Sequence, residues 1–331
     1  MRSKISPLPF LSGLGFATIF GLSFLFAKDA IATIAPLSLL AMRFLLAAGV
    51  VSLLHLLGLF PLALRGKNIA PLLLLAVFQP VAYFLFEING LQFTHTSQAG
   101  MMIALIPIVV AIMSRAWLGE RITVLQGASI LMSVSGVLLI AIKDVARAGP
   151  ANAMGLALLF LAVCSAAVFN IISRRVSGQF TPFETTFVMM WVGAVSFSLP
   201  LLVAQGAQAF AASFSAVLAS WQLMMAVVYL GVLSSVVAFF LVNYTLSHLP
   251  ATQSAIFANV GTLVAVLAGV LVRSEPFHWY SALGVAMIIL GVWGANRFGA
   301  TEGCRRGTAD RAQTGVVADD NCVVNRVFRG K

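Results

Sequence analysis

The chain has 331 residues, of which 60% are hydrophobic and 9% charged, and its mean hydropathy is +1.01. A soluble protein of this length could not bury so much apolar surface, so the composition excludes a soluble globular protein. It predicts an all-α polytopic membrane protein. The basic residues behind the net charge of +10 lie singly or in pairs between apolar runs, which favours topology signals over a nucleic-acid-binding patch.

The apolar runs predict about ten transmembrane helices, each close to the ~20 residues that a bilayer requires. The basic start resembles a signal peptide, but its apolar part is long and further spans follow, so we expect an uncleaved first helix. Pro80 and Pro107 fall inside spans and are expected to kink them. The expected spans are residues 8–27, 36–57, 69–91, 97–117, 123–142, 153–173, 183–204, 223–246, 252–272 and 279–295.

Residues 101–140 and 255–293 share one pattern, in which a short charged break separates two apolar runs. One unbroken register aligns Glu120 with Glu275, so each stretch is predicted to be a helical hairpin with a carboxylate at its tip. With five spans per half, two similar halves in series must point in opposite directions, which predicts two inverted five-helix repeats. The expected boundaries are residues 1–147 and 148–298 for the repeats and 299–331 for a disordered cytoplasmic tail.

The Lys and Arg residues are concentrated on one side of the predicted spans. If the amino terminus is inside, the outer segments carry only Lys28, Lys143, Arg147 and Arg273. This bias predicts a multi-pass protein of the cell (inner) membrane with both termini in the cytoplasm. The inner segments then carry the basic tail and Arg2, Lys4, Arg65, Lys67, Arg115, Arg121, Arg174 and Arg175.

The segment from Tyr83 to Ile108, YFLFEINGLQFTHTSQAGMMIALIPI, has an aromatic-rich third span, an Ala/Ser-rich entry to the fourth and a proline within it. With Leu118-Gly119-Glu120-Arg121 and Arg43-Phe44, this pattern resembles the EamA-type branch of the drug/metabolite transporter superfamily. The resemblance implies ten helices in two inverted five-helix repeats and the transport of small metabolites. It also implies a central cavity lined by spans one, three, four, six, eight and nine.

The second half departs from the family pattern at two places. Glu275 matches, but Arg273-Ser274 stands where Leu-Gly is usual, and Thr262 stands where Pro107 stands in the first half. Both Glu120 and Glu275 are expected just before a helix start, where free N–H groups and the helix dipole stabilise a carboxylate. A helix-cap or loop-locking role is therefore expected for them, and proton carriage is the alternative.

Gln79, Tyr83 and Glu87 are spaced to share one face of span three. Arg43 lies roughly 10 Å and Glu87 about 6 Å from the outer ends of their spans, so a pair across neighbouring helices is feasible. Two interpretations stay open. The pair either forms a charged wall of the substrate cavity that contacts an amine or a carboxylate, or is a structural ion pair that locks spans two and three.

Further polar and aromatic residues in the spans are candidates for the cavity wall. The alternative for each is helix–helix packing, with the amides bonding across helices. The full set of candidate substrate-binding residues is Phe24, Gln79, Tyr83, Glu87, Asn170, Phe239, Asn243 and Asn259.

The motifs favour a transporter over an enzyme. No aspartate lies inside a predicted span, and the histidines and cysteines show no ligand spacing, so no catalytic group, metal or cofactor is expected. The favoured function is a secondary transporter that exports amino acids or related metabolites by alternating access. A membrane enzyme and a lipid- or drug-translocating protein are the alternatives. The expected partners are a small-molecule substrate and the lipid bilayer, with no nucleic acid, in a monomer or homodimer.

Overall fold

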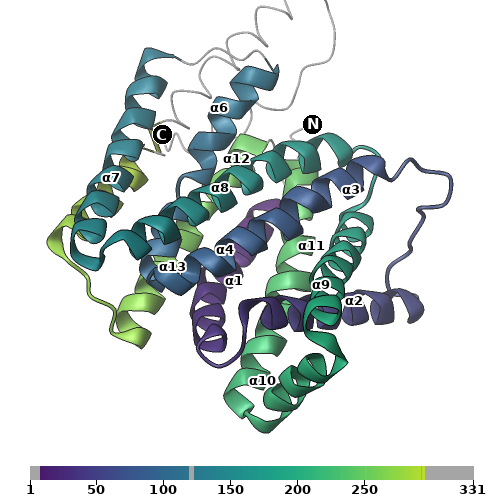
Figure 1. Ribbon diagram of the computed structural model, residues 1–331. Coiled ribbons are helices and arrows are strands. Elements are labelled where there is room, and N and C mark those ends of the chain that lie inside the picture. Colours follow the sequence, from purple (N-terminus) through teal and green to yellow (C-terminus); the bar gives the residue numbers. More distant parts are fainter. Residues whose placement is uncertain (1–7, 119–122, 250, 292, 295–331) are drawn as a thin grey trace, which may run out of the picture.

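The computed structural model describes residues 8–118, 123–249, 251–291 and 293–294, which form helices and connecting turns without a strand (Figure 1). Among these residues, seven helical segments are long and apolar enough to cross a membrane, and four further apolar helices are shorter. The prediction of an all-α polytopic membrane fold is therefore confirmed. The expected count of about ten spans is not confirmed, because seven segments of the described residues reach the required length.

The first half of the chain contains four of the seven long apolar segments and one shorter apolar helix, and its third and fourth spans are interrupted. The π-helix η1 joins α3 to α4 within the third span. In chain order the elements are α1 (Leu8–Ile31), α2 (Pro36–Leu56), α3 (Ala70–Ala76), η1 (Val77–Ala82), α4 (Tyr83–Phe93), α5 (Thr96–Ile103), α6 (Ile106–Leu118) and α7 (Val124–Ala148).

The second half repeats this order, including both interruptions. In span eight, the π-helix η2 occupies the same place as η1 in span three. Span nine is divided into α12 and α13, as span four is divided into α5 and α6. A further break, at Gly206, lies in α9. The predicted tail, residues 299–331, lies outside the described residues. The elements are α8 (Pro150–Val176), α9 (Pro182–Ala219), α10 (Trp221–Val228), η2 (Tyr229–Val237), α11 (Ala238–His248), α12 (Ala251–Ile256), α13 (Ala258–Arg273) and a last helix, Trp279–Gly291.

Equivalent helices of the two halves pack against each other in opposite directions. Along α2 and α9, Ser38 near the start of one meets Ser213 near the end of the other (Oγ to Oγ, 3.1 Å), and Trp191 donates to Ser52 (3.1 Å). The same holds for α7 and the last helix, where Gly136 lies against the backbone of Gly284, whereas Gly291, later in the last helix, lies against Ser129, earlier in α7.

The pair α5 and α13 follows the same rule. Gly100 lies against Ala265, whereas Ser97, earlier in α5, lies against Gly269, later in α13. Because three pairs of equivalent helices run antiparallel, the two halves are inverted with respect to each other, as the sequence repeat predicts.

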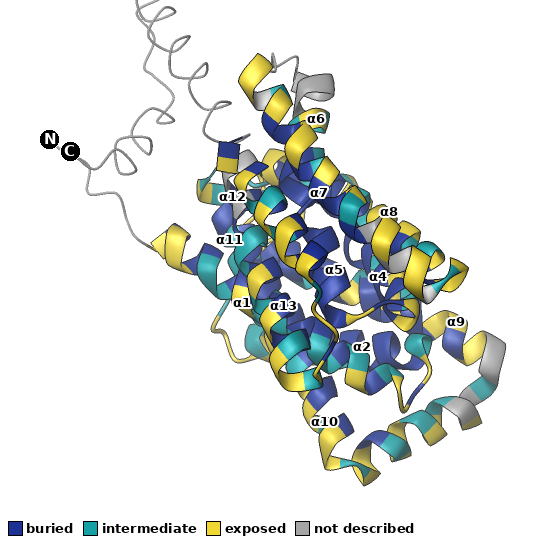
Figure 2. Cartoon of the chain, turned by 90° about the vertical axis from the view of Figure 1, so that its left-hand side faces the viewer, coloured by how far each residue is buried: buried dark blue, intermediate teal, exposed yellow. Residues whose placement is uncertain are grey.

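The outside of the bundle is apolar. Figure 2 shows buried residues on the faces that helices turn toward one another and exposed residues on the outer faces. Large apolar side chains are among the exposed ones, including Val203 (78%), Leu271 (75%) and Trp279 (71%). Such a surface is suited to lipid rather than water, since soluble monomers rarely expose extended apolar patches.

The interruption of the third span follows from its proline. Pro80 has no N–H, and its ring disfavours a helical conformation of the preceding residue. Gln79 accordingly has φ −147° and ψ 114° in the middle of the span. The kink expected at Pro80 is therefore present. Pro107 lies at the start of α6, just after the break between α5 and α6 at Ala104 and Leu105.

Small residues allow the first and ninth spans to approach closely. The Cα of Gly21 in α1 faces the backbone of Gly261 in α13, and Gly261 in turn faces the carbonyl oxygen of Ala17. Close backbone approach between membrane helices depends on such positions, because van der Waals packing is a main source of their association.

Replacing Gly21 by Ala should destabilise the protein. A Cβ there would lie 2.6 Å from the Gly261 carbonyl oxygen, and overpacking of this kind costs about 1–3 kcal/mol. The measurement is the Tm in detergent. Gly49→Ala in α2 is the matched control, because its Cβ would meet nothing within 4 Å, and its Tm should stay equal or rise slightly. An unchanged Tm for Gly21→Ala would contradict the close packing of α1 on α13.

Candidate functional site

A cavity lies between the two halves, where the interrupted helices meet. Its volume is about 70 Å³, room for roughly five water molecules. The lining residues come from α1, η1, α4, α5, α6, α8, α11, α12 and α13. These elements make up spans one, three, four, six, eight and nine, the six that were expected to surround a cavity.

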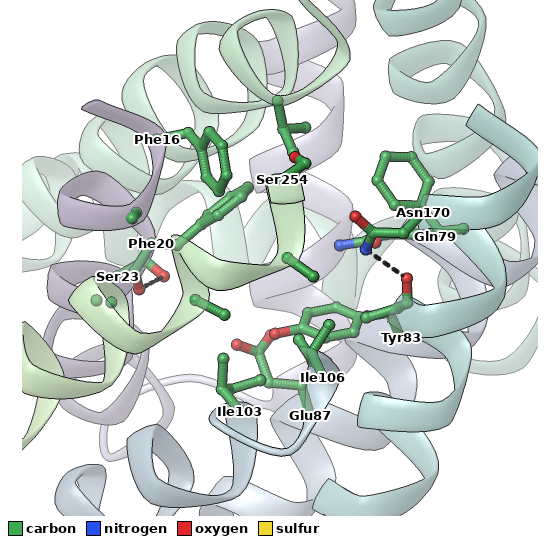
Figure 3. Close-up of a pocket in the computed structure, with 18 of the residues that line it drawn as sticks. Phe16, Phe20, Ser23, Gln79, Tyr83, Glu87, Ile103, Ile106, Asn170 and Ser254 are labelled. Carbon is green, nitrogen blue, oxygen red and sulfur yellow. Dashed lines mark hydrogen bonds between the residues drawn. The ribbon is translucent and has the colours of Figure 1, made fainter. Parts of the chain in front are cut away.

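The wall of the cavity is mostly apolar, with a few polar groups (Figure 3). Aromatic rings come from both halves, and the polar side chains are spread over α1, the third span, α8 and α12. This composition is typical of small-molecule sites. The aromatic lining residues are Phe16, Phe20, Phe24, Tyr83, Phe84 and Phe169, and the other polar ones are Ser23, Gln79, Glu87, Asn170 and Ser254.

Five of the eight candidate residues line this cavity: Phe24, Gln79, Tyr83, Glu87 and Asn170. The break at Pro80 places Gln79 there although its backbone is not helical, so Gln79 does not follow the regular face shared by Tyr83 and Glu87. The amide nitrogen of Asn170 donates to the Ala166 carbonyl one turn earlier (2.8 Å); this bond is drawn in Figure 3.

The other three candidates lie outside the cavity wall. Asn243 joins three helices, because its oxygen accepts from Ser173 of α8 (2.9 Å) and its nitrogen donates to Thr186 of α9 (3.1 Å). This is the packing role that was the alternative for the amides. Phe239 is fully buried behind the wall, against the rings of Phe20, Phe84 and Phe169, and Asn259 of α13 is not among the lining residues.

Ser254 was not among the candidates, although its hydroxyl is buried and has no hydrogen-bond partner among the described residues. The register that aligns Glu120 with Glu275 places Ser254 opposite Ala99, at the entry of span nine. A polar residue at the entry of span nine is therefore the sequence signal by which Ser254 could have been identified as a candidate.

Arg43 is buried and does not form the expected ion pair with Glu87. Its Nε donates to Ser235 (2.8 Å) and its Nη2 to Ser234 (2.8 Å), both in η2. The guanidinium carbon also lies 4.0 Å from the centre of the Phe84 ring. Hydroxyl oxygens and aromatic faces thus stabilise the cation in place of a carboxylate.

Glu87 is left with an unsatisfied oxygen. The residue is 3% exposed, and its Oε2 has no hydrogen-bond partner within the described part of the chain. Among the described lining residues of the cavity, it is the one carboxylate, and none is Lys, Arg or His. The cavity therefore presents an acceptor of negative character to whatever occupies it.

Glu275 caps a helix of the opposite half. Its carboxylate accepts hydrogen bonds from the backbone amides of Thr96 and Ser97 at the start of α5, each 2.8 Å long, and we call this arrangement the Glu275 cap. The expected cap was on the helix that follows Glu275, so the partner was wrong although the carboxylate does meet a helix start. Glu120 lies outside the described residues.

The Glu275 cap affects the charge state of its carboxylate. Burial acts to raise the pKa of Glu275, but the hydrogen bonds from Ser97 and Thr96 lower it by more, so that this pKa lies below its ordinary value. Gly269 makes the approach possible, since a Cβ at that position would lie 2.4 Å from the Glu275 carboxylate.

Further bonds join the same end of the bundle. Lys28 at the end of α1 donates to the carbonyl oxygens of Leu91 (2.5 Å) and Thr94 (2.7 Å) at the end of α4. Arg273 at the end of α13 pairs with Asp29 of α1. Together with the Glu275 cap, these bonds tie α1, α4, α5 and α13 to one another. All four helices contribute to the cavity wall, so these bonds hold together the helices that line the cavity.

Two inverted halves around a partly polar cavity, in a chain with membrane-spanning helices, define a membrane transporter. The sequence profile of the EamA-like transporter family matches residues 8–142 and again residues 153–297. The chain belongs to this family.

Several proteins of the same kind are similar over most of the chain. The chain is 34% identical over 287 residues to an uncharacterized transporter, YcxC, of Bacillus subtilis (strain 168), covering 87% of this chain and 92% of YcxC. It is 29% identical over 200 residues to a probable terminal-alkyne amino-acid exporter of Streptantibioticus cattleyicolor, covering 60% and 63%. A solved crystal structure with 17% identity superimposes with a TM-score of 0.64 over 87% of this chain and 98% of the other, which supports the fold.

Replacing Glu275 by Gln should lower the Tm, because hydrogen bonds to a charged group contribute about 1.5–3 kcal/mol. The pKa of Glu275 is lowered in the folded protein, so the stabilisation is complete above the ordinary value of 4.5 and is lost as the pH falls through the folded-state pKa. The Tm difference between the two proteins should therefore be constant near neutral pH and shrink in acid.

The matched control for this substitution is Asp29→Asn. The Asp29 side chain is 56% exposed, and exposed ion pairs contribute about 0–1 kcal/mol. A Tm loss as large as that of Glu275→Gln would show that charge at this end of the bundle, rather than the Glu275 cap, is what stabilises the fold.

Proposed function

We propose that the chain is a secondary transporter that exports amino acids or related small metabolites by alternating access. The observation that carries the proposal is the cavity between the inverted halves, whose lining helices are joined at one end by the Glu275 cap and the bonds of Lys28. The relative described as a probable terminal-alkyne amino-acid exporter supports the class of substrate, and a wall of aromatic rings and amides suits such molecules.

The distribution of basic residues supports the orientation. We place both termini in the cytoplasm of a cell membrane, so that the Glu275 cap lies on the outer side. Export then requires the Glu275 cap to open while the opposite end closes. Breaking the cap exposes two amides and one carboxylate to water, which can bond to all three, so opening toward the solvent is feasible.

The opposite end of the bundle is also tied. Glu184 at the start of α9 accepts from Lys67 (2.9 Å) and from the amide of Ala63 (3.1 Å) in the connection between α2 and α3. Arg174 of α8 donates to the carbonyl oxygen of Leu246 at the end of α11 (2.9 Å). We infer that the two sets of bonds open in turn during the cycle, each while the other holds its end of the bundle together.

Cross-linking the Glu275 end should stop transport. Asp29 and Arg273 contact each other, so both are replaced by Cys in a chain whose Cys164, Cys304 and Cys322 are Ser, and a short bifunctional thiol reagent joins them. The measurement is efflux of a mixture of radiolabelled amino acids from proteoliposomes. We expect efflux before cross-linking, little afterwards, and recovery when a cleavable reagent is reduced.

The single-cysteine variants Asp29→Cys and Arg273→Cys, treated with the same reagent, are the controls and should keep their efflux. Unchanged efflux from the cross-linked protein would contradict alternating access through this end. Absence of amino-acid efflux from the protein before cross-linking would contradict the proposed substrate class.

A further inference from the structure

The described residues of the cavity wall include one acidic side chain and no basic one, which bears on the charge of a ligand that can bind there. Glu87 offers a buried oxygen without a hydrogen-bond partner among the described residues, and no Lys, Arg or His is among the described lining residues. A buried carboxylate without a partner is costly in a low-dielectric setting. A ligand that donates a hydrogen bond and carries positive charge would remove that cost, and a ligand carboxylate would increase it.

Arg43 does not offer a site for a ligand carboxylate. It is 2% exposed and is not among the residues that line the cavity. Two of its nitrogens already donate to Ser234 and Ser235, and its planar group packs against Phe84, whose ring is part of the wall. Recruiting Arg43 would break both hydrogen bonds, whereas recruiting Glu87 breaks none of the hydrogen bonds described for it.

The surroundings of Glu87 also favour a cation. The ring of Tyr83 lies one turn before it, and Phe24 and Phe84 complete an aromatic wall. Aromatic faces attract ammonium groups, and more strongly when water is excluded. Ser254, whose hydroxyl has no described partner either, lies on the far side of the cavity from Glu87 in Figure 3. It can bond to a neutral polar group at the other end of a ligand.

We propose that this cavity binds its substrate by a protonated amine held on the Glu87 carboxylate, and that a substrate carboxylate is not required. The inference rests on the proposed function, because it names the recognised group of the substrate of the same cavity. The ligand class is small primary amines with an apolar body, including amino acids and their analogues without an acid group.

A matched set of three compounds tests the proposal on the full-length protein. Leucine carries both groups, isoamylamine has the same skeleton without the carboxylate, and 4-methylpentanoate has it without the amine. Thermal shifts in detergent report binding, because a ligand of the folded state raises the Tm. Detergent also avoids the passive crossing of a bilayer by the uncharged form of the amine, which would disturb a transport assay. We expect isoamylamine to raise the Tm at least as much as leucine, and 4-methylpentanoate to leave it unchanged.

Glu87→Gln keeps the size of the side chain and removes its charge. The affinity for isoamylamine should fall about 10- to 100-fold, as expected on losing a hydrogen bond to a charged group. Glu184→Gln is the matched control: Glu184 is a buried carboxylate at 1% exposure that does not line the cavity. It should change the starting Tm and leave the ligand-induced shift as it is.

Three results would overturn the inference: no shift with isoamylamine, a shift with 4-methylpentanoate as large as that with isoamylamine, or a shift that persists in Glu87→Gln. The first two come from the unmodified protein and do not depend on the folding of a variant. None of the three affects the cross-linking of the Glu275 end, so failure of this inference and failure of the transport mechanism are distinguishable.

Discussion

A helix that starts or breaks inside a membrane exposes backbone N–H groups that lipid cannot satisfy. Two contacts between the halves meet this constraint, one at a helix start at the end of the bundle and one beside the break between α5 and α6. The first amides of α5 donate to the Glu275 carboxylate from the other half of the chain, and the hydroxyl of Thr262 donates to the carbonyl oxygen of Gly100 in the same helix pair (2.8 Å). The interrupted helices are thus held by the opposite half, and the space at their breaks becomes the cavity.

Two buried charges share this region, and the protein stabilises them by different means. Arg43 has its own set of hydroxyl and aromatic neighbours, in the bulged turn that η2 provides. Glu87 faces the cavity without such a set. A stable ion pair between them would have satisfied both, and it would have removed the carboxylate from the reach of a ligand. Their separation is therefore consistent with a structural cation and a carboxylate that is free to bind.

Much of the fold could be predicted from the sequence, because its signals can be read from the order of residues alone: run lengths, proline positions and the repeat that aligns Glu120 with Glu275. The site could be predicted only in part. Tyr83 and Glu87 follow a helical face, whereas Asn243 shares the same kind of spacing with Phe239 and instead joins α8, α9 and α11. Spacing shows that residues share a face, but which neighbour covers that face depends on tertiary packing. For the same reason the partner of Glu275, 178 and 179 residues away, could not be read from local pattern.

The packing of α7 on the last helix has a consequence for the history of the two halves. Gly136 lies against the backbone of Gly284, and Gly284 lies against that of Gly136 in return. A larger residue at either position would collide with the main chain of the other, so after a duplication these two sites could not diverge independently. A substitution at one of the two glycines therefore requires the other to stay small, which couples the two halves at this helix pair.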